Sequence, residues 1–210
     1  MNHTDVDTYR TAAHAVAQDQ NAPVPVAIYA GAATAAVRRS QLAGGGRFTP
    51  ELLDELTSDR LAHAAAVEVG PVGCLSLEQW VCDEWQTIDE RAAEAVPFTR
   101  TEAENMYRRA TIELLIEADD HASMAAISFA AALAVAHIRW HSMGIDGSTD
   151  PAATDVIHAV LDEDPVASLA REQLDEATRA SLAMAVGNQW RAIMERVQIM
   201  EMTAAIEAAA

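Results

Sequence analysis

Hydrophobic side chains recur at helical spacing through residues 166–210, the last part of the chain. Alternating steps of four and three residues place one set along a single side of a helix: Val186, Trp190, Ile193, Val197, Met200 and Ala204. A second set lies on another side of the same helix: Ala192, Ile199, Met202 and Ile206. One packed face covers only one of these sets, so the second set predicts a contact with a partner surface.

Proline, glycine and capping residues divide the rest of the chain into further helical segments. We expect helices over residues 5–18, 25–42, 58–67, 76–95 and 99–143, and others that begin at Pro50, Pro151 and Pro165. Asp119 and Asp120 predict a break within the longest segment, because aspartate often caps a new helix. Loops are expected at Gly44–Gly46, at residues 70–73 and at residues 145–149.

Particular residues sharpen these expectations. Ser58 is the expected cap of its helix, and Thr99 with Glu102 has the spacing of a capping box. Gly31, between Ala27 and Ala35, would allow another backbone to approach closely. Trp85 lies in the middle of the apolar side of residues 76–95, so we expect it in the core.

Composition agrees with a helical protein. Alanine, the best helix former, occurs 45 times, only 5% of residues are aromatic, and no segment alternates as a strand does. The predicted fold is an all-α bundle of about seven to nine helices with a long C-terminal helix. We expect one domain over residues 1–210, or a main bundle over 1–145 followed by a C-terminal segment over 150–210. No internal repeat stands out.

The charge disfavours two classes of partner. The formal net charge is −18, which opposes binding to the phosphates of nucleic acids and to anionic membranes. All 14 basic residues are arginine, which with so much alanine indicates a GC-rich genome such as that of an actinobacterium or its phage.

Other features favour a cytoplasmic protein. The first seven residues are polar and acidic, unlike a secretory signal. Cys74 and Cys82 are too few for a disulfide framework and are expected as free thiols. The uncharged runs Gln20–Val37 and Ala122–Ala136 are interpreted as buried helices rather than membrane spans.

Three histidines form a candidate metal site. His137 and His141 are four residues apart on one helix face, and His63 on an earlier helix could supply a third nitrogen. One histidine followed far downstream by His-x-x-x-His resembles the DinB-like metal-binding bundles. That resemblance implies that the three histidines hold a divalent metal, for which we expect Zn or Ni. The alternative is that the pair interacts favourably with the C-terminal end of its helix.

A second candidate is the polar row Glu113, Glu117 and His121, at steps of four residues. Pointing into a bundle, these groups could bind iron or manganese or act as acid and base. The alternative is a half-exposed polar face. The chain contains neither a phosphate-binding glycine loop nor a Gly-x-Ser-x-Gly nucleophile motif.

The sequence therefore favours association over catalysis. We expect a non-enzymatic interaction or assembly protein without a cofactor, which forms a homo-oligomer or binds a protein partner. Its interface would include Ile199, Met202 and Ile206. The alternative is a metal-dependent helical-bundle enzyme that uses His63, His137 and His141.

Overall fold

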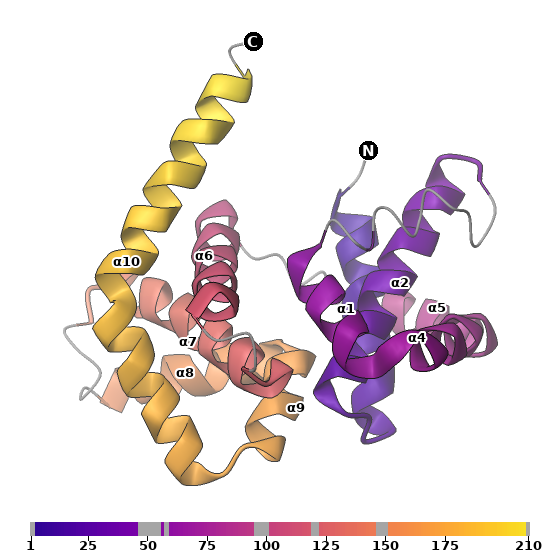
Figure 1. The fold of residues 1–210 in the computed structure, drawn as a ribbon, viewed down its shortest axis with the longest axis horizontal. Helices are drawn as coiled ribbons and strands as arrows, with labels where there is room; N and C mark the ends of the chain where they lie inside the picture. Colours follow the sequence, from indigo (N-terminus) through magenta and orange to yellow (C-terminus); the bar gives the residue numbers. More distant parts are fainter. Residues whose placement is uncertain are drawn as a thin grey trace. The chain divides into compact units, whose positions relative to one another are not determined.

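The computed structural model describes residues 3–45, 56, 59–94, 101–118, 122–145 and 151–208. This part of the chain forms nine helices and no strand, and the last helix is the longest (Figure 1). The prediction of an all-α fold with seven to nine helices and a long C-terminal helix is confirmed.

The helices group into two compact units, residues 1–99 and 100–210. The junction between the units lies neither at the expected loop of residues 44–46 nor at that of residues 145–149. The expectation of one domain over residues 1–210 stays a prediction.

The first unit is organised around one apolar helix. Its helices are α1 (His3–Asp19), α2 (Val24–Leu42), α4 (Arg60–Asp83) and α5 (Trp85–Glu94). α2 packs against α1 and α4, while α5 packs against α1. One buried cluster joins α1 to α5: Ala12, Ala13, Val16, Ile88 and Ala92. Trp85, expected in the core, is half-buried, because Val81 and Ile88 occupy the buried positions of that side.

Small residues let α2 sit deep in this unit. Its side chains are buried without interruption over residues 27–37. At Gly31 an added Cβ atom would lie 2.0 Å from His14 Nε2, so the close neighbour is a side chain of α1 and not the predicted backbone. Gly44, with φ of 78°, follows the helix in a conformation that favours glycine.

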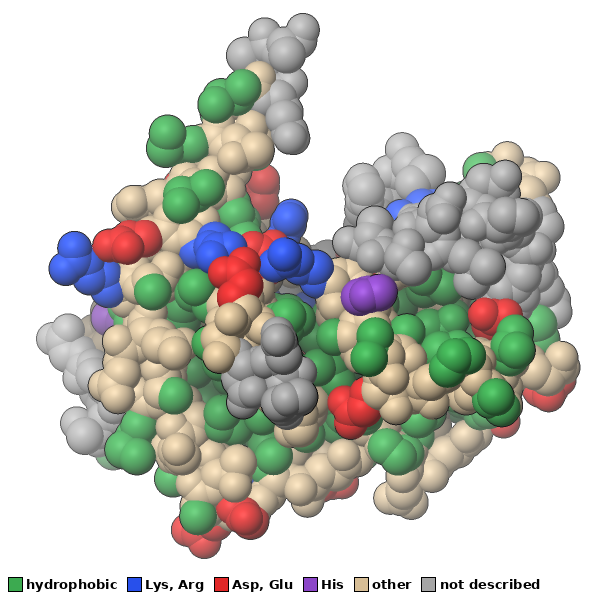
Figure 2. Space-filling view, viewed as in Figure 1, with side chains coloured by type: hydrophobic (Ala, Val, Ile, Leu, Met, Phe, Trp, Pro, Cys, Tyr) green, Lys and Arg blue, Asp and Glu red, His purple; other side chains and the backbone are tan. Residues whose placement is uncertain are grey.

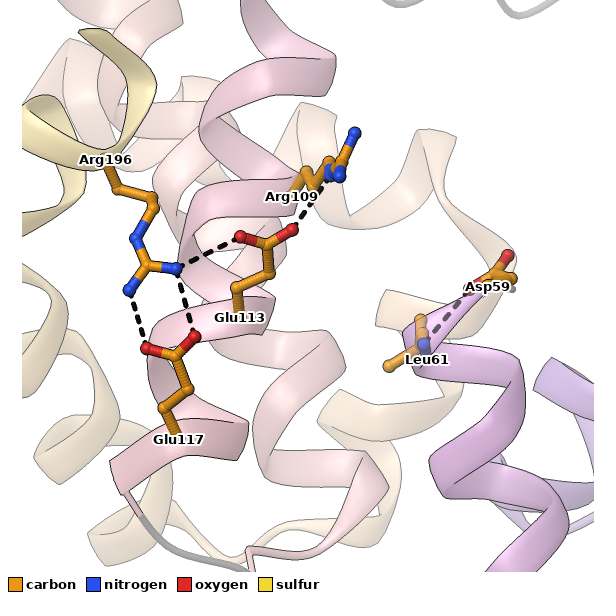
Figure 3. Close-up of polar contacts among 6 residues, drawn as sticks. All are labelled: Asp59, Leu61, Arg109, Glu113, Glu117 and Arg196. Atoms are coloured by element: carbon orange, nitrogen blue, oxygen red, sulfur yellow. Dashed lines mark hydrogen bonds and ion pairs between the residues drawn. The ribbon is translucent and has the colours of Figure 1, made fainter. Parts of the chain in front are cut away.

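α4 corrects two local predictions. Asp59 caps it by accepting hydrogen bonds from the backbone N–H groups of Leu61 and Ala62 (Figure 3), and Ser58 lies outside the described residues. The loop expected at residues 70–73 is a kink at Gly70, where φ is 77°. The helix expected over 76–95 is also divided, since α4 ends before Glu84 and α5 follows it.

The second unit is also organised around an apolar helix. It contains α6 (Glu102–Ala118), α7 (Met124–Ser142), α8 (Pro151–Glu163), α9 (Pro165–Gln173) and α10 (Glu176–Ala208). α7 contacts all four other helices. Among the described residues α7 alone has the length and apolar character of a membrane span, but 67% of that window is buried within the protein. The prediction of a buried helix holds for residues 127–136.

Helix ends in this unit follow the predicted chemistry at partly different residues. Thr101 and Glu104 form a capping box at the start of α6, and Thr99 of the predicted box lies outside the described residues. The predicted break is present, since α6 ends at Ala118 and Ser123 caps α7; Asp119 and Asp120 themselves lie outside the described residues.

Residues 166–210, whose spacing follows one continuous helical pattern, belong to two helices, α9 and α10. Asp164 caps α9 as expected, through the N–H groups of Val166 and Ala167. α9 ends at Gln173, and Asp175 accepts a hydrogen bond from the Thr178 N–H at the start of α10. The helix is therefore interrupted before the first apolar set, which begins at Val186.

Candidate functional site at the C-terminal helix

The first apolar set of α10 is the face that packs within the second unit, and we call it the seam. Val186, Ile193 and Val197 are buried, and Trp190 and Met200 are half-buried. The helix lies against α6 and α7 along this face. Ala204, the last member of the predicted set, is exposed, so the packed part of the seam ends near Met200.

The second apolar set is exposed to solvent, and we call its last three members the strip: Ile199, Met202 and Ile206. Their exposed fractions are 59%, 66% and 68%. With 33 residues α10 is about 50 Å long, roughly twice the length of the 17-residue α6 against which it packs. Its end therefore projects beyond α6 (Figure 1), with apolar side chains along the projecting turns (Figure 2).

Ion pairs fix α10 to α6 just before the strip. Arg196 donates to both carboxylate oxygens of Glu117, at 3.0 and 2.6 Å, and to Glu113 at 3.3 Å. Arg109 donates to the other oxygen of Glu113 at 2.9 Å (Figure 3). Glu113 is 9% exposed, so these two arginines provide the charge balance that a buried carboxylate needs.

These ion pairs involve two members of the predicted polar row, which consists of Glu113, Glu117 and His121. Both glutamates engage arginines, and His121 lies outside the described residues. The contacts give the two carboxylates a role in holding α10 against α6. The sequence analysis did not identify Arg196, which is one of three arginines on α10 and pairs with two acids four residues apart.

Aromatic rings stack where the end of α7 meets α10. Tyr107 of α6 stacks on Trp190, with centroids 5.2 Å apart and planes at 17°. The His137 ring lies 3.7 Å from the Trp190 ring and 4.5 Å from that of Trp140. Trp140 is 5% exposed, and its indole N–H is buried without a hydrogen-bond partner. These rings pack the middle of the seam.

His137 and His141 are in direct contact. Their Nε2 atoms are 3.0 Å apart, a hydrogen-bond distance in which one ring donates and the other accepts. Burial, together with a smaller effect of the neighbouring His141, lowers the pKa of His137 from 6.5 to about 4. His137 is therefore neutral at pH 7.

His63, the third histidine of the candidate metal site, is exposed on α4 in the first unit, whereas His137 and His141 belong to the second. Over the part of the chain that the structure describes, no three histidine, cysteine or acidic side chains are grouped as ligands for a metal ion. The site of His63, His137 and His141 stays a prediction. Cys74 and Cys82 are free thiols, each half-buried.

Lowering the pH should destabilise the protein through His137. Its pKa is 6.5 when unfolded and about 4 when folded, so the unfolded chain binds more protons between these values. The contribution of neutral His137 to the free energy of unfolding is fully present above pH 6.5 and declines as the pH falls toward 4. We expect His137→Gln to reduce the loss of unfolding free energy between pH 7 and pH 5, measured by urea denaturation. Equal losses in both proteins would contradict this assignment.

Comparison with known proteins found no matching family model, no similar curated protein and no similar solved structure.

Proposed function

We propose that this chain is a non-enzymatic helical assembly protein that self-associates through the projecting end of α10. The observation that supports the proposal is the strip, in which three large apolar side chains are each more than half exposed. Isolated exposed hydrophobic residues are common on protein surfaces, but a row of them along one helix face is typical of a contact surface.

A second copy of the chain is the occupant that this geometry favours. The steps of three and four residues between Ile199, Met202 and Ile206 are those by which helices pack side by side. Every copy projects the same strip, so two strips can pair about a two-fold axis, each supplying the same surface. Methionine suits such a contact because its flexible side chain adapts to the opposite surface.

Charge should oppose this contact rather than create it. Two chains of net charge −18 repel one another, and the strip itself is apolar. Added salt screens that repulsion and leaves the burial of apolar surface in place. Self-association is therefore expected to strengthen between low and moderate salt, whereas an interface held by ion pairs would weaken.

The test is to replace Ile199 and Met202 with glutamate in the full chain. Both side chains are mostly exposed, so the second unit should remain folded while each contact acquires unpaired charges. Light scattering coupled to size-exclusion chromatography should show an oligomer for the unmodified chain and a monomer for the variant. Monitoring at tens of micromolar detects association stronger than about −6 to −7 kcal/mol.

The matched control places two glutamates near the other end of the same helix, at Ala180 and Met184. Both residues are exposed on α10 and lie outside the strip. This control variant should retain the mass of the unmodified protein. A monomeric unmodified chain at these concentrations would overturn the proposal, as would equal dissociation by the two variants.

A further inference from the structure

The two units contain the same short pattern of residues. Residues 81–92 and 186–197, which we call the closing segments, align without a gap when 105 is added to the numbers of the first. Five of the twelve positions are identical: Val, Trp, Ile, Glu and Arg, at 81, 85, 88, 90 and 91 and again at 186, 190, 193, 195 and 196. These identities include the residues that pack each segment.

The identical valine, isoleucine and tryptophan residues have similar environments in the two units. Val81 and Ile88 are 1% and 0% exposed in the first unit, and Val186 and Ile193 are 5% and 1% exposed in the second. Each tryptophan stacks on a tyrosine of the first helix of its unit. Trp85 lies 5.7 Å from Tyr9 between ring centroids, and Trp190 lies 5.2 Å from Tyr107.

The polar contacts are repeated as well. Arg91 pairs with Asp19 near the end of α1, as Arg196 pairs with Glu117 near the end of α6. The tyrosines and these acids share one numerical offset: Tyr9 and Asp19 correspond to Tyr107 and Glu117 when 98 is added.

Within the closing segments the shared glutamates accept equivalent hydrogen bonds. Gln86 donates to Glu90 at 2.9 Å, and Arg191 donates to Glu195 at the same distance. Each donor lies four residues before its glutamate, so the same one-turn contact is present in both segments.

The central helices correspond at an offset of 100. α2 and α7 are both 19 residues long and begin at residues 24 and 124. Burial follows the same order in both, with residues 24 and 27–36 matching 124 and 127–136. Each is followed by a glycine of positive φ, Gly44 at 78° and Gly144 at 72°.

The next helix starts also correspond, at the offset of the closing segments. Asp59 and Asp164 each cap a helix by accepting from the backbone N–H groups two and three residues later. The kink at Gly70 corresponds to Asp175, in the break between α9 and α10. The interruption of the helix is therefore repeated too.

We infer that this chain is a tandem duplication of one helical unit, in which the same tyrosine, tryptophan, arginine and acid hold the closing segment in place. The offset grows from 98 to 100 between the first and second helices of each unit, and to 105 between the glycine after the second helix and the next capping aspartate. A common preference for helix would not by itself place matching helix caps, ring stacks and ion pairs at one offset within each segment.

Comparing the two units distinguishes the residues that both share from the surfaces that only one unit has. In the first unit α5 ends at Glu94, two residues after its closing segment, whereas α10 continues to Ala208. In sequence, Glu94, Pro97 and Thr101 occupy the positions that correspond to the strip at the offset of 105, so its large apolar residues are not repeated there. Conversely, the first unit exposes Val67, Val72 and Leu75, where the second has Glu172, Ala177 and Ala180. The shared valine and isoleucine are buried in both units, whereas these surface positions differ.

The test exchanges one closing segment within the full chain. Residues 186–197 are replaced by the sequence of residues 81–92, which returns the shared valine, tryptophan, isoleucine, glutamate and arginine to their places. We expect cooperative melting within roughly 10 °C of the unmodified chain, the loss reflecting alanine at the position of Val197. Hydrogen exchange of α6 peptides should stay slow, which reports on the second unit alone.

The control inserts residues 80–91 at the same place, a shift of one residue with nearly the same composition. One residue is about 100° of helical rotation, so the tryptophan and isoleucine leave the packed face. This variant should lose protection in α6 and melt well below the matched exchange. If the matched exchange loses as much protection as the shifted one, even with Val197 restored, the duplication is wrong. Oligomeric state is not a readout, so self-association can fail independently.

Discussion

Ile193→Ala is expected to lower the free energy of unfolding of the second unit by about 2–5 kcal/mol, the range for truncating a large buried aliphatic side chain. Ile193 is 1% exposed, and it lies on the seam between the buried residues Val186 and Val197. Removing its side chain leaves a cavity where α10 packs on α6 and α7. The stacked Trp190 and the ion pairs of Arg196 limit how far α10 can move to fill that cavity. Urea denaturation followed by circular dichroism measures the loss.

Ile199→Ala is the matched control, because the same substitution is made six residues later on the same helix, at a residue that is 59% exposed. Its effect on unfolding of the dilute protein should stay within about 0.5 kcal/mol. Similar losses at the two positions would mean that the division between seam and strip is wrong. Ile88→Ala should resemble Ile193→Ala, since Ile88 holds the equivalent buried position in the first unit.

Helices and their faces could be predicted from local chemistry alone. Spacing separated the seam from the strip correctly, because a residue's position on a helix follows directly from its number. Pro151 and Pro165 begin helices as expected. Boundaries that depend on competition between neighbouring caps were harder. Thr99 and Thr101 each have a glutamate three residues later, and only packing decides which pair caps α6.

Tertiary partners could not be predicted in the same way. A half-exposed Trp85 and a buried Ile88 occupy the same apolar side of a helix, and which one enters the core depends on how α5 lies against α1. Likewise, the sequence placed Glu113 and Glu117 on one face but contained nothing local that assigned Arg196 to them.

The duplication was overlooked for a physical reason. Alanine, valine and isoleucine can replace one another in the interior of a helical protein, so few identities remain between α2 and α7. Loop insertions also change the offset, which hides a fixed period. The signal that survives is the pattern of Val, Trp, Ile, Glu and Arg in the closing segments, where ring stacking and ion pairing restrict the residue types.

Arg139→Leu is expected to cost the second unit about 3 kcal/mol, because it leaves a buried carboxylate without its cation. Arg139 Nε donates to Glu104 at 2.7 Å, and its Nη1 atom donates to Glu163 at 2.6 Å. Glu104 is 7% exposed, so water cannot replace the guanidinium. The leucine retains much of the apolar stem, so the loss reports mainly on charge. Arg191→Leu, at an exposed pair on α10, should change stability by less than about 1 kcal/mol.

A second substitution distinguishes the lost ion pair from lost packing. Glu104→Gln removes the buried charge but retains an acceptor for the Thr101 N–H in the capping box. In the Arg139→Leu background it should therefore recover about 1–2 kcal/mol, although alone it weakens the protein. Urea denaturation of the four proteins gives this coupling energy directly. If the two losses simply add, the pair contributes nothing beyond its separate side chains, and α7 is held to the start of α6 by apolar contacts alone.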